Sequence, residues 1–324
     1  MIEVRNLTKY YGPHKAVDNL SFTVERGQIY GFLGPNGAGK STTMNILTGC
    51  LAATEGTVLI DGHDILEDQI AAKKCIGYLP ELPPLYPDMT PREYLMFVGE
   101  AKGLSGAELR KAVAYVCKRT SIEDVANRLI RHLSKGYKQR VGIAQAILGN
   151  PEIIILDEPS VGLDPTQIIE IRDLIKDLAK ERTVILSTHI MQEVTAICNH
   201  VLIINKGKLL ANDTPENLSD ILMDRASFDL VVKGDSVKVL NAVQAVKGVL
   251  SASILDTEGE TVHVLVDCAK DADPEEDIFY ALSDARCPII KIERQEMTLE
   301  QVFIRITSQN IDTITETDSD KEDN

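Results

Sequence analysis

One octapeptide limits the possible folds of this chain more than any other feature. It matches the pattern G-x-x-x-x-G-K-[ST] and reads Gly34-Pro35-Asn36-Gly37-Ala38-Gly39-Lys40-Ser41. An apolar, β-rich run at residues 28–33 precedes it, and a helical run that begins with Thr42 and ends at residue 47 follows. Glycines in such a strand-to-helix turn allow backbone N–H groups to converge on an anion, and the helix N-terminus adds its positive dipole end. The sequence therefore predicts a phosphate-binding loop, with a glycine-rich turn that binds no ligand as the alternative.

A second motif completes the prediction of a nucleoside triphosphatase. The apolar run at residues 153–156 ends in Asp157 and Glu158, as expected for a buried strand that reaches its carboxyl end. In a phosphate-loop protein, Lys40 contacts the β- and γ-phosphates, while Ser41 and Asp157 hold Mg²⁺. Glu158 is then placed to accept a proton from the attacking water. An apolar run that ends in Asp-Glu often marks only a strand that reaches solvent. The prediction of catalytic roles for Asp157 and Glu158 therefore depends on the phosphate loop upstream.

The 324 residues exceed what one hydrophobic core usually holds, so we predict two domains. Residues 1–214 alternate β-rich and helical runs, which is typical of an α/β domain with a largely parallel sheet. A helical subdomain is expected at about 82–140, where proline and glycine turn signals separate helical stretches. We expect the strands at residues 2–6, 17–24, 28–33, 56–60, 76–79, 152–156, 183–187 and 200–205.

The pattern changes after Thr214 and Pro215. Residues 228–294 read as strand, helix, two hairpin strands around Gly259, helix and strand. This β-α-β-β-α-β order predicts a small α+β, ferredoxin-like accessory domain at 215–308. Residues 309–324 carry many acidic side chains, and we expect a disordered acidic tail there.

Composition excludes several classes of function. The net charge is −15, whereas a protein that binds nucleic acid needs a basic face. No stretch approaches the length of apolar sequence that crosses a bilayer, and the N-terminus lacks a signal peptide, so a cytoplasmic location is predicted. The six cysteines are scattered and form no CxxC pair, which favours reduced thiols.

Four further features make the chain resemble the ATP-binding subunits of ABC transporters. Residues 133–140 contain Leu-Ser-Lys-Gly-Tyr, which resembles the family signature Leu-Ser-Gly-Gly-Gln and also reads as a plain Ser134 helix cap. Residues 159–164 resemble the D-loop that ends in Asp164, and His189 follows a strand as the switch histidine does. Tyr11 occupies the position of the adenine-stacking aromatic, although Tyr10 is adjacent to it. The resemblance extends over about residues 2–210.

The resemblance implies a P-loop ATPase core whose substrate is ATP with Mg²⁺. In the family, two copies of the domain meet head to tail, and each ATP lies between the phosphate loop of one copy and the signature of the other. Ser134 and Gly136 would then close over the γ-phosphate from the second copy, while His189 contacts the same phosphate and Asp164 couples the two sites. An integral membrane permease subunit completes the transporter, which places this chain at the inner face of the membrane.

The motifs at residues 79–81, 84–90 and 133–137 are most similar to the branch that serves multidrug, antibiotic and gliding-motility exporters. The sequence departs from the family where Glu81 replaces a glutamine that helps to hold Mg²⁺, and where Lys135 and Tyr137 replace Gly and Gln in the signature. The Glu81 carboxylate can still hold the metal, although it adds negative charge.

Alternatives from other classes are less consistent with the sequence. An ATPase of DNA repair would insert long coiled coils between the two nucleotide motifs, and a translation-associated member would carry a second phosphate loop. A regulatory nucleotide switch without turnover conflicts with the presence of Glu158. The accessory domain remains either a ligand sensor or a dimerising and stabilising lobe, and the second is favoured because no recognisable site gathers there.

Overall fold

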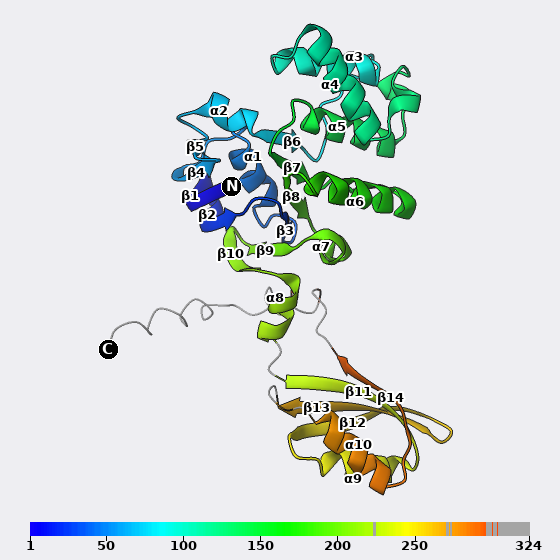
Figure 1. Ribbon diagram of the computed structural model, residues 1–324. Coiled ribbons are helices and arrows are strands. Elements are labelled where there is room, and N and C mark those ends of the chain that lie inside the picture. The colour runs from blue at the N-terminus through cyan, green and yellow to red at the C-terminus, as the bar shows by residue number, and fades with distance from the viewer. Residues whose placement is uncertain (223–224, 270–271, 273, 296–299, 301–302, 304–324) are drawn as a thin grey trace. The chain divides into compact units, whose positions relative to one another are not determined.

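A computed structural model describes residues 1–222, 225–269, 272, 274–295, 300 and 303. The chain divides into two compact units, residues 1–215 and 216–324 (Figure 1). The predicted acidic tail at 309–324 lies outside the described residues.

The first unit is built around a six-stranded sheet. Its strand order is β10 (Lys208–Asp213), β9 (His200–Asn205), β3 (Ile29–Leu33), β8 (Thr183–Thr188), β7 (Ile153–Asp157) and β6 (Ile76–Leu79). The five strands from β9 to β6 run parallel, and β10 is antiparallel at one edge. Strands β3, β7 and β8 are buried along their whole length, as expected for central strands of a parallel sheet that is covered on both faces.

Three of the predicted strands form a separate antiparallel sheet, so the expectation of one largely parallel sheet was incomplete. This sheet has the order β2 (His14–Val24), β1 (Ile2–Tyr11), β4 (Glu55–Ile60) and β5 (His63–Asp64). Its strands alternate between buried and exposed residues, most clearly in the second half of β2. This alternation is typical of antiparallel strands with one solvated face, and it distinguishes them from the buried central strands.

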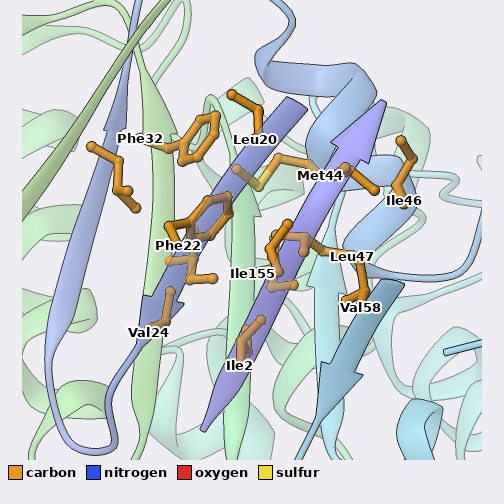
Figure 2. Close-up of a cluster of buried hydrophobic side chains, with 14 of the residues drawn as sticks. Ile2, Leu20, Phe22, Val24, Phe32, Met44, Ile46, Leu47, Val58 and Ile155 are labelled. Carbon is orange, nitrogen blue, oxygen red and sulfur yellow. The ribbon is translucent and has the colours of Figure 1, made fainter. Parts of the chain in front are cut away.

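Helix α1 (Lys40–Leu47) packs between the two sheets. Met44, Ile46 and Leu47 are buried in one apolar cluster that also contains Ile2 from β1 and Ile155 from β7 (Figure 2). This shared core fixes the start of α1 at the carboxyl end of β3, which is where the octapeptide lies.

The predicted helical subdomain contains α3 (Pro91–Ala101), α4 (Gly106–Arg119) and α5 (Lys135–Ile147), with short 3-10 turns at Glu123–Val125 and Ile130–His132 (Figure 1). A capping box starts α3: the Thr90 hydroxyl accepts from the Glu93 N–H at 3.3 Å, and Glu93 Oε2 accepts from the Thr90 N–H at 2.8 Å. The remaining helices of this unit are α2 (Gln69–Lys74), α6 (Pro165–Ala179) and α7 (Met191–Ile197).

The second unit has the predicted β-α-β-β-α-β order. Strands β11 (Arg225–Lys233), β12 (Val249–Glu258), β13 (Thr261–Ala269) and β14 (Ile289–Gln295) form an antiparallel sheet of order β12-β13-β11-β14. Helices α9 (Ser236–Gln244) and α10 (Glu275–Asp284) contribute Val239, Val243 and Ile278 to its core. Helix α8 (Pro215–Leu222), like β10, was not predicted from the sequence.

Candidate nucleotide site

Four of the predicted site segments follow parallel strands of the same sheet. The octapeptide follows β3, Glu81 follows β6, Asp157 ends β7 with Glu158 next to it, and His189 follows β8. Because β3, β8, β7 and β6 are parallel neighbours, their carboxyl ends meet at one edge of the sheet. The topology therefore gathers groups that are far apart in the sequence.

The phosphate loop turns into α1 at Gly39. This residue has φ of 103° and caps the helix, and a Cβ added to it would lie 2.5 Å from the Ala16 carbonyl oxygen of β2. Both the positive φ and the close approach to β2 require glycine. The sequence motif thus matches a specific backbone path.

Lys40 is buried and lies over its own loop. Its Nζ donates to the carbonyl oxygens of Gly34 at 2.7 Å and Pro35 at 3.3 Å, and it is 3.7 Å from Glu158 Oε1. Burial lowers the pKa of the Lys40 ammonium, and the Glu158 and Asp157 carboxylates oppose this effect. A cation held beside anion-binding backbone is suited to phosphate oxygens.

Glu158 and His189 contact each other directly. His189 Nδ1 lies 2.9 Å from Glu158 Oε2 and 3.1 Å from Oε1. The Glu158 side chain is 9% exposed and that of His189 is 45% exposed, so the pair extends from the interior to the pocket. Glu158 also has φ of 49°, an uncommon backbone conformation for a residue with a side chain and one that often accompanies function.

A pocket of about 620 Å³ joins these groups. Among the predicted residues it brings together Tyr11, Glu81, Glu158 and His189 with most of the octapeptide. Tyr11 lines the pocket, whereas the adjacent Tyr10 does not. The full lining is Tyr11, His14, Ala16, Pro35, Asn36, Gly37, Gly39, Lys40, Ser41, Thr42, Glu81, Glu158, Val161 and His189.

Three lining residues were not anticipated: His14, Ala16 and Val161. His14 follows the Gly12-Pro13 turn signal after Tyr11, so its sequence position gave a weak indication. Val161 belongs to the segment at 159–164 that resembles the D-loop, whereas Ala16 carries no sequence signal, because only the fold brings it to the pocket.

Ser134 and Gly136 of the signature lie near Asp164 at the end of the D-loop, and these three residues are away from this pocket. The Ser134 hydroxyl caps α5 by accepting from the Tyr137 N–H at 3.3 Å, and Asp164 caps α6 by accepting from the Gln167 N–H at 2.9 Å. A Cβ at Gly136 would lie 2.8 Å from Gln167 Cδ, which shows that the two helix starts adjoin. None of Ser134, Gly136 and Asp164 lines the pocket.

The candidate metal ligands offer only oxygen. Asp157 is buried and accepts a hydrogen bond from the Ser187 hydroxyl, while Ser41 and Glu81 are exposed at the pocket. Within the described part of the chain, no three His, Cys, Asp or Glu residues gather into a metal-binding group. Mg²⁺ commonly keeps several waters and binds one or two carboxylates together with substrate phosphates. The donor set therefore fits a metal that arrives with a nucleotide.

Among the residues that the structure describes, no helix is both long enough and apolar enough to cross a bilayer.

Comparisons with known proteins concern the sequence and the fold of the chain. The ABC transporter family model matches residues 17–161. The linearmycin resistance ATP-binding protein LnrL of Bacillus subtilis (strain 168) is 31% identical over 96% of this chain and 99% of its own length. The Nod factor export ATP-binding protein I of Ralstonia nicotianae is 31% identical over 96% of this chain and 95% of its own length. The dimeric structure of MJ0796, a bacterial ABC transporter cassette, has a TM-score of 0.61 at 30% identity and covers 66% of this chain and 98% of its own.

Proposed function

Because this chain belongs to the family of ABC transporter ATP-binding proteins and is therefore an ATPase subunit, we propose that it powers export through a separate membrane subunit. The observation that carries the proposal is the convergence of the phosphate loop, Glu158 and His189 on one pocket. Two relatives similar over nearly the full length are named for resistance and export, which supports the direction of transport. The transported substrate is not specified by this chain.

In the proposed reaction, the loop backbone and Lys40 bind the phosphates of ATP, and Tyr11 stacks on adenine. Glu158 accepts a proton from water as the water oxygen attacks the γ-phosphorus, and the bond to the β-phosphate oxygen breaks to leave ADP. His189 contacts the γ-phosphate and holds Glu158 through their 2.9 Å contact.

Mg²⁺ is part of the proposal, with Ser41, Asp157 and Glu81 as the residues that would hold it. Bound there, the ion would neutralise charge on the phosphate oxygens. The carboxylate of Glu81 provides an oxygen ligand as glutamine would, with an additional negative charge.

We further propose that two copies form the complete site. Ser134 is exposed outside the pocket of its own chain, so its hydroxyl is available to a nucleotide bound by a second copy. Gly136 would add a backbone N–H, and Asp164 would couple the two sites. The dimeric cassette of MJ0796 supports this arrangement. The helical subdomain and Glu81 would receive the permease, which would place the chain on the cytoplasmic face of the membrane.

The accessory domain at 215–308 is proposed to be a dimerising and stabilising lobe and not to sense a ligand. Its polar groups pair with one another on the sheet, as where Asp267 accepts from the hydroxyls of Ser227 at 2.7 Å and Ser251 at 2.9 Å. A role in DNA repair is not favoured, because only a short helical subdomain separates the two nucleotide motifs.

Glu158→Gln tests the assignment of the base. The amide keeps the shape of the side chain and loses its basicity, so steady ATP hydrolysis should fall by about 10²- to 10⁴-fold, the usual contribution of a general base. Binding of a fluorescent ATP analogue should remain. If the variant hydrolysed ATP at the parental rate, Glu158 would not be the catalytic carboxylate.

A further inference from the structure

Glu193 is a buried acid that the proposed reaction does not use. It is the third residue of α7, and it is 1% exposed. Within the described part of the chain, it forms no ion pair with a lysine or arginine. Burial of a carboxylate is unfavourable unless hydrogen bonds satisfy it, so its partners require an explanation.

Its two partners are hydroxyl groups from different segments of the site. Glu193 Oε1 accepts from Ser160 Oγ, and Oε2 accepts from Thr188 Oγ1 at 2.9 Å. Ser160 is 4% exposed and Thr188 is 0% exposed. Thr188 Oγ1 also accepts from the Ile190 N–H at 3.0 Å, so its own hydrogen is available to the carboxylate.

These hydroxyls belong to the two segments that carry the reacting pair. Ser160 is two residues after Glu158 and lies in the D-loop, while Thr188 ends β8 directly before His189. Glu158 and His189 meet in the pocket, and Glu193 joins the same two segments inside the protein. Together with the contact between Glu158 and His189, the two hydrogen bonds of Glu193 close a ring. The ring passes through Glu158, Ser160, Glu193, Thr188 and His189.

We infer that Glu193 is a positioning residue, which ties the D-loop to the end of β8 and thereby holds Glu158 and His189 in register with each other. If the D-loop moves and displaces Ser160, the Glu193 carboxylate transmits this displacement to Thr188. Asp164, which we expect to couple the sites of the two copies, lies in the same loop. The hydrogen bonds of Glu193 therefore connect the D-loop to Glu158 and His189. The inference rests on the proposed function, since it concerns the same site.

Glu193→Met is the most direct test. Methionine keeps about the length of the side chain, but its thioether is only a weak acceptor, so both hydrogen bonds to the hydroxyls are lost. A displacement of about 1 Å at a catalytic pair can cost 10²-fold in rate, and we expect kcat to fall at least tenfold. The KM for ATP and the Kd of an ATP analogue should change less than twofold, because the phosphate loop is untouched.

Ser160→Ala and Val194→Ala complete the experiment. Ser160→Ala removes one of the two hydrogen bonds, so it should lower kcat, and the double variant Ser160→Ala/Glu193→Met should be no slower than Glu193→Met alone. Val194 is a buried neighbour on α7, and its truncation weakens the packing of the helix without touching the link. Val194→Ala should therefore lower Tm while leaving kcat within twofold of the parent.

Two results would overturn the inference: an unchanged kcat in Glu193→Met, or an equal loss of kcat in Val194→Ala. If the parent hydrolyses ATP and the Glu158→Gln variant does not, either result would exclude the positioning role of Glu193. The proposed function would still stand. If the parent had no ATPase activity, the proposed function itself would be wrong.

Discussion

The Gly39→Ala substitution tests the backbone of the phosphate loop quantitatively. Gly39 has φ of 103°, and the added methyl group would lie 2.5 Å from the Ala16 carbonyl oxygen. Placing an L-residue with a side chain in a left-handed conformation costs roughly 1–2 kcal/mol. Overpacking of a crowded position costs roughly a further 1–3 kcal/mol. The expected loss of unfolding free energy is thus about 2–5 kcal/mol, the sum of these two costs.

Gly62→Ala is the matched control. Gly62 has φ of 86°, and an added Cβ would have no heavy atom within 4 Å. This variant has only the backbone cost of about 1–2 kcal/mol. In a folded unit of this size, 1 kcal/mol corresponds to roughly 2–4 °C in Tm. Gly39→Ala should therefore melt about 4–20 °C below the parent, and Gly62→Ala about 2–8 °C below it.

Thermal melting of both variants and titration with a fluorescent ATP analogue provide the measurements. Gly39→Ala should weaken nucleotide binding at least tenfold, because Lys40 directly follows the displaced residue, whereas Gly62→Ala should bind like the parent. Equal melting temperatures of the two variants, or normal nucleotide binding by Gly39→Ala, would show that the phosphate loop does not require glycine at position 39.

Two further predictions concern the limits of the site. A chain that ends at Pro215 should still bind ATP, because every pocket residue and the edge strand β10 precede that point; loss of binding by this truncated but folded protein would show that the unit boundary is misplaced. Glu81→Gln should retain ATP hydrolysis with an altered Mg²⁺ dependence, and Glu81→Ala should lose transport coupling more than ATP binding. Superimposable Mg²⁺ titrations of the parent and both variants, with unchanged transport, would mean that Glu81 is only a solvated loop residue.

Much of the site was predictable because its signals are local. The octapeptide at Gly34–Ser41 is contiguous, and Asp157 and Glu158 follow an apolar run that any buried strand would show. The pattern of alternating and helical runs also predicted the β-α-β-β-α-β order of the second unit. In each case, a short sequence window determines the local structure.

The remaining features depend on contacts between distant residues. The sequence pattern marked β1, β2 and β4 as strands but did not separate their antiparallel sheet from the parallel one. Edge strand β10, at Lys208–Asp213, is mostly half-buried and carries no continuous apolar run. Likewise, Glu193 reads as an ordinary helical acid until the fold places it between Ser160 and Thr188. Such links exist only after the sheet brings β7 and β8 side by side.

Sedimentation velocity of the Glu158→Gln variant shows directly whether two copies of this chain complete each ATP site. This variant should bind ATP without consuming it, so the closed state accumulates. We predict that MgATP converts the monomer into a dimer, that ADP does not, and that adding Ser134→Glu prevents dimer formation by placing a negative charge against the γ-phosphate. A variant that binds MgATP and stays monomeric, or that dimerises equally well with Ser134→Glu, would contradict the claim.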